Sequence, residues 1–184
     1  MSRTTVLSPA GYRRTPWKNG GGVTTDIAFD GEVWRFSRTP ITTAGPFSDY
    51  TGYDRIQVLV AGRGLVLDTP DGEIDLRQPF QPVRFAGETP ITSRLERGPV
   101  EVINLMGERS RVALDLVVLD TGLSRPLGPG IHIAYCPAGR AILRLAGETR
   151  ELQSDRGLRI EDVAGMVACD AGPVVLGSIR CVSR

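Results

Sequence analysis

Glycine and proline interrupt this sequence so often that long helices have little room to form. Its 184 residues include 22 glycines and 13 prolines, and no window of ten or more residues carries uninterrupted apolar positions at helical spacing. Short alternating or continuous apolar runs recur instead, as is typical of strands bounded by turns. The sequence therefore predicts an all-β chain with very little helix.

Several strands can be placed from these runs. Residues 55–76 read RIQVLV-AGRG-LVLD-TPDG-EIDL, which predicts three short strands joined by two glycine turns as an antiparallel meander. In VEVINLM, residues 100–106, the side chains of Val102, Asn104 and Met106 share one strand face. Further strands are expected at 111–119, 131–135, 140–145, 166–169 and 173–182.

A faint internal repeat indicates how these strands are organised. AGRGLVLDTPDGEIDL, from residue 61, can be laid over AGRAILRLAGETREL, from residue 138, with chance similarity as the alternative. The repeat predicts two tandem cupin-type β-barrels or sandwiches, a bicupin, because closed antiparallel sheets limit exposed edges. We expect an N-terminal barrel carrying the pocket at 1–120 and a smaller unit at 121–184, with strands possibly shared between them.

The charge balance and the cysteine content indicate which partners and which cellular location to expect. Lys and Arg number 22 against 21 Asp and Glu, without a basic tract, so neither nucleic acid nor a membrane surface is an expected partner. No apolar stretch approaches the roughly 20 residues of a membrane helix, and the N-terminus lacks the apolar middle of a secretory signal. Three cysteines without CxxC spacing indicate free thiols, and hence a cytoplasmic location.

The single histidine, His132, argues against common catalytic centres. The usual cupin metal site takes several histidines and a glutamate, so we expect neither a metal nor another cofactor. A Ser-His-Asp triad would have to use His132, for which a structural role is the better interpretation. Enzymatic activity is therefore an open question, with the balance against it.

The segment PWKNGGGVTTDIA, residues 16–28, is the first candidate ligand site. Three glycines allow backbone amides to approach a ligand closely, while Trp17 offers a wall, Lys18 a cation and Asn19 a hydrogen-bonding amide. The alternative is a β-bulge where the N-terminal strand bends over the barrel.

Other polar residues share this chemical character. GPFSDYTGYDR, residues 45–55, combines aromatic rings with a guanidinium, Asn104 interrupts an apolar strand, and Arg84 is a cation in PVRF. Cations, amides and aromatic walls together predict binding of a small anion such as a carboxylate. The candidate ligand-binding residues are Trp17, Lys18, Asn19, Gly20, Gly21, Gly22, Thr24, Phe47, Ser48, Asp54, Arg55, Arg84 and Asn104.

With these motifs, the chain resembles the HutD/Ves family of bicupins. PWKNGGGVTTDIA, WRFS, AGPFSDYTGYDR, PVRFAGE and VINLM carry the resemblance, which extends over about residues 12–119. It implies a two-cupin fold without the usual metal. Family members are encoded with histidine-utilisation enzymes in some bacteria, a role in sensing a metabolite such as N-formylglutamate has been suggested, and no enzymatic activity is firmly attached to them.

Three functions remain open at this level. The leading hypothesis is a non-catalytic bicupin that senses or sequesters a small carboxylate such as N-formylglutamate. The rival is a metal-independent cupin enzyme of isomerase or epimerase type, in which Lys18, Asp54 or a tyrosine would be the acid or base. The third is a structural or partner-docking β protein; fold analogy also suggests a possible homodimer.

Overall fold

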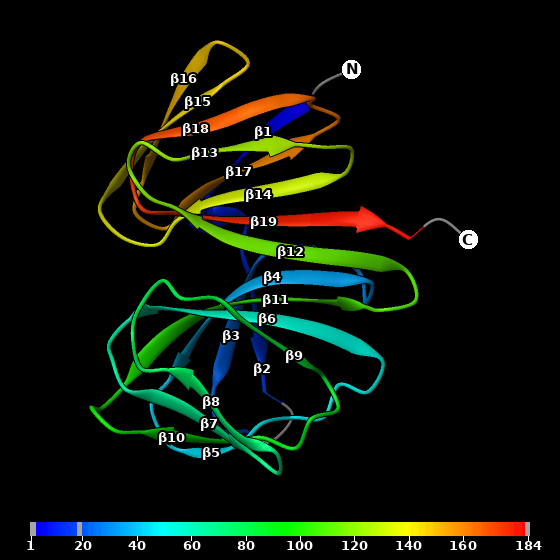
Figure 1. Cartoon of the computed structure of the whole chain (residues 1–184), viewed down its shortest axis with the longest axis vertical. Coiled ribbons are helices and arrows are strands. Elements are labelled where there is room, and N and C mark those ends of the chain that lie inside the picture. Colours follow the sequence, from blue (N-terminus) through cyan, green and yellow to red (C-terminus); the bar gives the residue numbers. More distant parts are fainter. Residues whose placement is uncertain (1–2, 18–19, 183–184) are drawn as a thin grey trace. The chain divides into compact units, whose positions relative to one another are not determined.

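The computed structural model describes residues 3–17 and 20–182, and this part of the chain is all-β, as predicted (Figure 1). One 3-10 turn, Pro9–Gly11, is the only helical element among the described residues. The strands are β1 Arg3–Leu7, β2 Arg13–Pro16, β3 Val23–Asp30, β4 Trp34–Ile41, β5 Gly45–Pro46, β6 Tyr53–Ala61, β7 Leu65–Thr69, β8 Gly72–Leu76, β9 Val83–Ala86, β10 Thr92–Leu95, β11 Val100–Glu108, β12 Val112–Leu119, β13 Ser124–Leu127, β14 Ile131–Cys136, β15 Arg140–Leu145, β16 Glu148–Gln153, β17 Arg156–Glu161, β18 Gly165–Ala171 and β19 Val174–Cys181.

The chain packs into two compact units. The N-terminal unit is Arg13–Val112, and the C-terminal unit combines Met1–Tyr12 with Ala113–Arg184. The N-terminal unit has one sheet in the order β2-β3-β4-β11-β6-β9 and a second in the order β5-β10-β7-β8. The C-terminal unit has sheets β1-β17-β14-β19-β12 and β13-β18-β15-β16. The sequence-based division into 1–120 and 121–184 stays a prediction.

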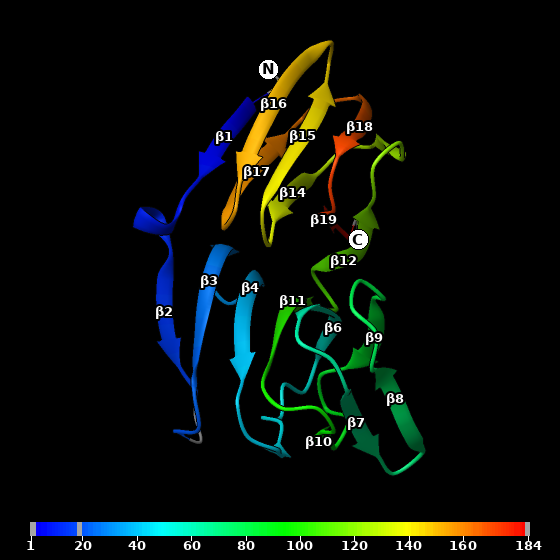
Figure 2. The same cartoon turned by 90° about the vertical axis from the view of Figure 1, so that its left-hand side faces the viewer.

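The two units repeat one strand plan. The order β4-β11-β6-β9 recurs eight strands later as β12-β19-β14-β17, and β5-β10-β7-β8 recurs as β13-β18-β15-β16. The hairpins β7–β8 and β15–β16, which carry the internal sequence similarity, therefore occupy equivalent places in their sheets (Figure 2). The faint sequence repeat thus coincides with a structural one.

The predicted meander over residues 55–76 is wrong in its first strand. β6 pairs with β9 and β11, whereas β7 pairs with β8 and β10 in the other sheet. Gly62 and Gly64, at φ +81° and +79°, form the turn that carries the chain between the sheets. A side chain at Gly62 would also come within 2.6 Å of the Pro99 carbonyl oxygen, so this crossing requires glycine.

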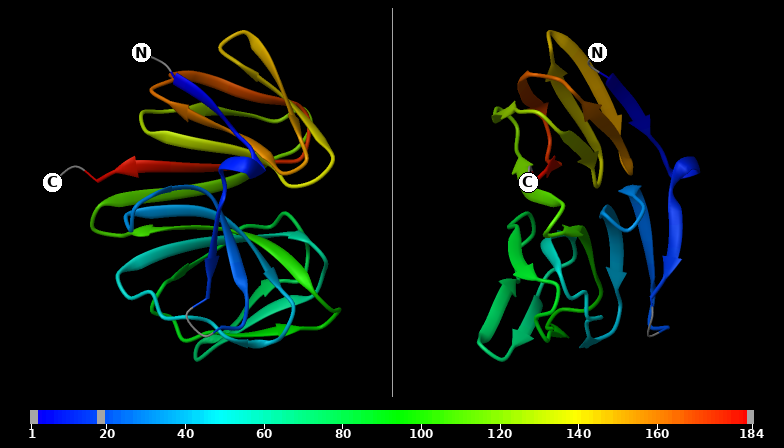
Figure 3. Two further views of the ribbon diagram at one scale, coloured as in Figure 1. Left: turned by 180° about the vertical axis from the view of Figure 1, so that it is seen from behind. Right: turned by 90° about the vertical axis from the view of Figure 1, so that its right-hand side faces the viewer.

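The first strand also pairs in a way that its local sequence does not reveal. β1 runs antiparallel to β17, from Arg3 opposite Glu161 to Leu7 opposite Gly157. Figure 3 shows the dark blue β1 along the orange β17 in both views. β1 is an edge strand and mostly exposed.

Each unit encloses its own hydrophobic core. In the N-terminal unit, Leu59, Leu65 and Leu67 belong to a cluster of buried side chains. In the C-terminal unit, Leu143 and Leu176 belong to another. The described residues form no helix that could span a membrane.

Candidate functional site

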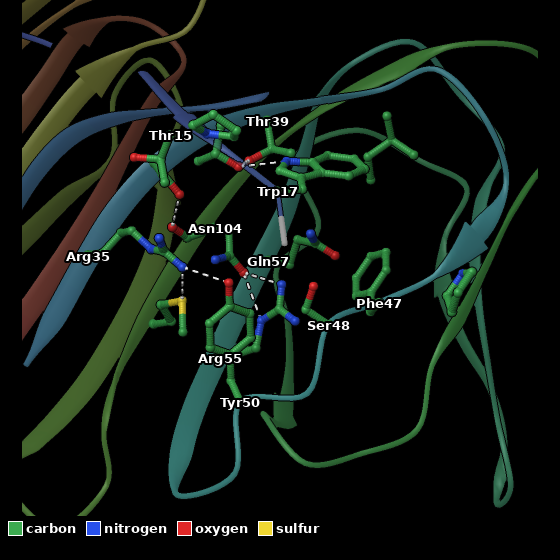
Figure 4. A pocket seen from close by; sticks show the side chains of 16 residues that line it. Thr15, Trp17, Arg35, Thr39, Phe47, Ser48, Tyr50, Arg55, Gln57 and Asn104 are labelled. Atoms are coloured by element: carbon green, nitrogen blue, oxygen red, sulfur yellow. Dashed lines mark hydrogen bonds between the residues drawn. The ribbon is translucent and has the colours of Figure 1, made fainter. Parts of the chain in front are cut away.

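The N-terminal unit contains a cavity of about 90 Å³ lined by both polar and aromatic side chains. Its walls come from β2, β3, β4, β6 and β11 of the six-stranded sheet, and from the segment around residues 46–50. Figure 4 shows Trp17, Phe47, Gln57 and Arg55 arranged around this common space. The lining consists of Thr15, Pro16, Trp17, Thr24, Arg35, Ser37, Thr39, Ile41, Pro46, Phe47, Ser48, Tyr50, Arg55, Gln57, Asn104 and Met106.

Arg55 is the most buried cation of this cavity. Only 8% of the residue is exposed. Its Nε and Nη2 both donate to Oδ1 of Asn104, at 3.3 and 3.2 Å. The rings of Phe47, Tyr50 and Phe85 lie 5.2, 5.6 and 5.0 Å from the guanidinium carbon. Within the described parts of the chain, Arg55 forms no ion pair with a carboxylate.

The burial of Arg55 has an electrostatic consequence. Desolvation is the main reason why its pKa falls to about 10, with Tyr50 acting to raise the pKa and the nearby Arg35 to lower it. A charge taken out of water without a counter-ion is destabilised, because surrounding dipoles and rings replace only part of its hydration. An anion in the cavity would compensate this cation directly.

A second guanidinium, Arg35 of β4, lines the same cavity. Its Nη2 donates to the Tyr50 hydroxyl at 3.2 Å and contacts the Met106 sulfur at 3.0 Å. Its Nε lies 3.8 Å from Oδ1 of Asp26. Arg35 and Arg55 are the only charged side chains in the described lining. The cavity is therefore electropositive.

Asp26 of β3 links the cavity residues Thr15 and Arg35, which lie on its two neighbouring strands. The residue is fully buried. Its Oδ2 accepts hydrogen bonds from Arg13 Nε at 3.0 Å and Thr15 Oγ1 at 2.8 Å. Together with the Arg35 ion pair, these contacts join β2, β3 and β4 through one carboxylate.

The glycine run forms the loop between β2 and β3 and fits around Trp17. Trp17 N–H donates to the Gly22 carbonyl at 2.9 Å, and Gly20, at φ +71°, donates to the Trp17 carbonyl at 3.0 Å. An added Cβ at Gly22 would lie 3.0 Å from the indole ring. The indole N–H donates to Thr24 Oγ1 at 3.0 Å, and Thr24 in turn hydrogen-bonds Thr39 at 3.0 Å.

These contacts place the glycines beside the cavity wall instead of in it. The lining does not include Gly20, Gly21 or Gly22. Gly22 instead leaves room for the indole ring of Trp17, which does line the cavity. The register irregularity of β3 lies between Asp26 and Ala28, beyond the glycine run. The irregularity is therefore at another position than the bulge that the alternative interpretation placed at the glycine run.

Six of the predicted ligand-binding residues line one cavity. Trp17, Thr24, Phe47, Ser48, Arg55 and Asn104 line the cavity together. Asp54 lies outside the lining and accepts a hydrogen bond from Arg109 Nε at 2.7 Å, and Arg84 is exposed outside it. Lys18 and Asn19 lie outside the described residues.

Sequence reasoning missed several polar lining residues, among them Arg35, Ser37, Thr39 and Gln57. Their spacing carries a signal. Arg35, Ser37 and Thr39 alternate along β4, and Gln57 lies two residues beyond Arg55 on β6. Extending the period of two from each quoted motif would have identified them.

The single histidine lies in the C-terminal unit. His132 is 3% exposed. Its Nε2 lies 2.9 Å from the Gly128 carbonyl, which can only accept, so Nδ1 accepts from the Ser178 hydroxyl at 2.8 Å. Both ring nitrogens are satisfied, in agreement with a structural role. In the described ranges, no group of three or more His, Cys, Asp or Glu side chains is placed to hold a metal ion.

Comparisons with known proteins place the chain among related sequences. The HutD family model matches residues 9–175. The chain is 32% identical, over 160 residues, to an uncharacterized 21.2 kDa protein in the hutC 3' region of Pseudomonas putida, a match that covers 79% of this chain and 84% of the relative.

Solved structures share the fold. HutD from Pseudomonas fluorescens SBW25, solved in a formate condition, matches with a TM-score of 0.83 and 27% identity, covering 98% of this chain and all (100%) of that one. Protein Ylba from E. coli matches with a TM-score of 0.71 at 8% identity over 99% of this chain and 93% of its own, a likeness in fold alone. With the repeated strand plan, these matches confirm the predicted bicupin architecture.

Proposed function

The chain belongs to the HutD family, and we propose that it is a non-catalytic protein that binds a small carboxylate metabolite in bacterial histidine utilisation. N-formylglutamate is the first ligand to test. The family resemblance and the relative from the hutC 3' region of Pseudomonas putida support the pathway. The chemistry of the cavity supports the ligand class.

The buried guanidinium of Arg55 is the observation that carries this proposal. Burying an unpaired charge costs several kcal/mol, and the contacts to Asn104 and three rings supply no negative charge. Its Nη1 makes no hydrogen bond to any described residue. A ligand carboxylate at Nη1 would provide both the missing acceptor and the missing charge.

The rest of the lining suits an anion. Arg35 adds a second positive charge, and the described lining holds no acidic side chain that would repel a carboxylate. Trp17, Phe47 and Tyr50 supply apolar walls that exclude water and so strengthen the charge interaction. The cavity of about 90 Å³ favours a small molecule.

Calorimetric titration tests this function. The wild-type protein is titrated with N-formylglutamate, glutamate, urocanate and formate, alongside Arg55→Gln and the charge-matched control Arg63→Gln, an exposed loop residue. We expect at least one carboxylate to bind the wild type and the control alike, and Arg55→Gln to lose at least roughly thirtyfold in affinity, in line with the loss of a buried charge-assisted contact.

Three results would each overturn a part of the proposal. Folded wild-type protein that binds none of the four carboxylates removes the ligand class, and unchanged affinity in Arg55→Gln removes the site. Conversion of a bound carboxylate into a product, followed by NMR, would contradict the non-catalytic role.

A further inference from the structure

Gln57 is a buried residue whose side-chain oxygen accepts no hydrogen bond from the described part of the chain. The residue is 2% exposed, lines the cavity, and its Oε1 has no hydrogen-bond partner among the described residues. Buried polar atoms in folded proteins are nearly always paired, and an exception at a binding cavity indicates an acceptor kept for a ligand. We infer that the ligand carries a hydrogen-bond donor beside its carboxylate and that Gln57 recognises this donor; the inference rests on the proposed carboxylate binding at Arg55.

The strand geometry places the two recognition groups together. Arg55 and Gln57 are two residues apart on β6, so their side chains leave the same face of the strand. Their Cα atoms are therefore about 7 Å apart. A ligand whose carboxylate lies on Arg55 has its neighbouring atoms within reach of Gln57.

The surrounding side chains do not supply the missing donor. Asn104 lies opposite Gln57 in the β6–β11 register, but its Oδ1 already accepts from Arg55 and its amide makes no hydrogen bond to Gln57. The hydroxyls of Thr24 and Thr39 hydrogen-bond each other, and neither of them donates to Gln57 Oε1. Gln57 thus lines the cavity while its Oε1 accepts no hydrogen bond from these groups.

This arrangement defines the chemical class of the ligand. A 2-hydroxy acid or a 2-acylamino acid offers an O–H or N–H on the carbon next to its carboxylate, and this group can donate to Gln57 Oε1. A simple carboxylate of the same length would fill the site but leave the buried amide unpaired. Sites built around such a hydrogen bond reject analogues that lack it more strongly than apolar pockets reject a missing methylene.

Matched ligand pairs test the inference. Lactate is compared with propionate, and 2-hydroxyglutarate with glutarate, by calorimetric titration of the full chain; each pair differs only in the hydroxyl donor. We expect the hydroxy acid of at least one pair to bind at least tenfold more tightly. In Gln57→Leu this difference should fall below threefold, with the simple carboxylate retained, whereas the exposed Gln81→Leu control should keep it.

A second variant guards against a loss of folding in Gln57→Leu. Gln57→Glu would place a carboxylate beside Arg55, so we expect it to raise the melting temperature and to abolish binding of every carboxylate tested. Equal binding of both members of each pair to the wild type overturns the inference but leaves carboxylate binding intact, since it means that water satisfies Gln57. Failure of all carboxylates at the wild-type protein overturns the proposed function as well.

Discussion

At the scale of single residues, Gly22 gives the glycine run its clearest role. Its missing Cβ leaves room for the Trp17 indole, which a side chain would approach to 3.0 Å. We therefore expect Gly22→Ala to displace the ring, lower the free energy of unfolding by about 1 to 2 kcal/mol and weaken carboxylate binding roughly tenfold. Urea denaturation, tryptophan fluorescence and calorimetry measure these effects.

Gly11→Ala provides the matched control, because nothing lies within 4 Å of a Cβ at that position. This variant should unfold within about 0.5 kcal/mol of the wild type. If Gly22→Ala leaves the fluorescence spectrum and the affinity unchanged, the indole does not need the space that glycine leaves, and the role assigned to Gly22 is wrong.

At the scale of elements, local pattern predicted strands far better than their pairing. The predicted range 140–145 coincides with β15, and the predicted face of Asn104 and Met106 does line one cavity. β1, in contrast, is short and mostly exposed, so it carries little of the apolar signal on which the prediction depends. That β6 and β7 lie in different sheets depends on distant partners, which no local window contains.

Asp26 shows how strand pairing and the site depend on each other. Its buried carboxylate serves Arg13 and Thr15 of β2 and faces Arg35 of β4. We expect Asp26→Asn to lower the free energy of unfolding by about 2 to 4 kcal/mol, because Arg13 and Arg35 lose their negative partner. Urea denaturation monitored by circular dichroism measures the change.

The control for this variant is Asp30→Asn, at the exposed end of the same strand β3. Removing that charge should change stability by no more than about 0.5 kcal/mol. Equal effects of the two substitutions would show that the buried carboxylate contributes no more than a surface one.

At the scale of the whole molecule, one strand plan is used twice with different interiors. Aligning Ala61 with Ala138, as in the sequence repeat, sets Arg55 against His132 and Gln57 against Ala134. His132 has both of its nitrogens satisfied, and Ala134 belongs to the hydrophobic core. The repeat can be seen in the sequence. Whether an equivalent position lines a cavity or belongs to the core depends on the side chains packed around it.

Each unit has a hydrophobic core, and the cavity lies in the N-terminal unit. We therefore predict that ligand binding slows hydrogen exchange in the N-terminal unit. In hydrogen–deuterium exchange with a saturating carboxylate at about 100 times its Kd, amides that exchange through unfolding of the N-terminal unit should slow by up to about a hundredfold. We expect protection in β6 and β11 and no change in β14 or β19, because their unit has a core of its own. The Arg55→Gln variant at the same ligand concentration should show no more than about fourfold slowing, because a thirtyfold loss of affinity leaves the ligand at only about 3 times its Kd. Equal protection of both units would instead mean that the two cores unfold as one cooperative structure.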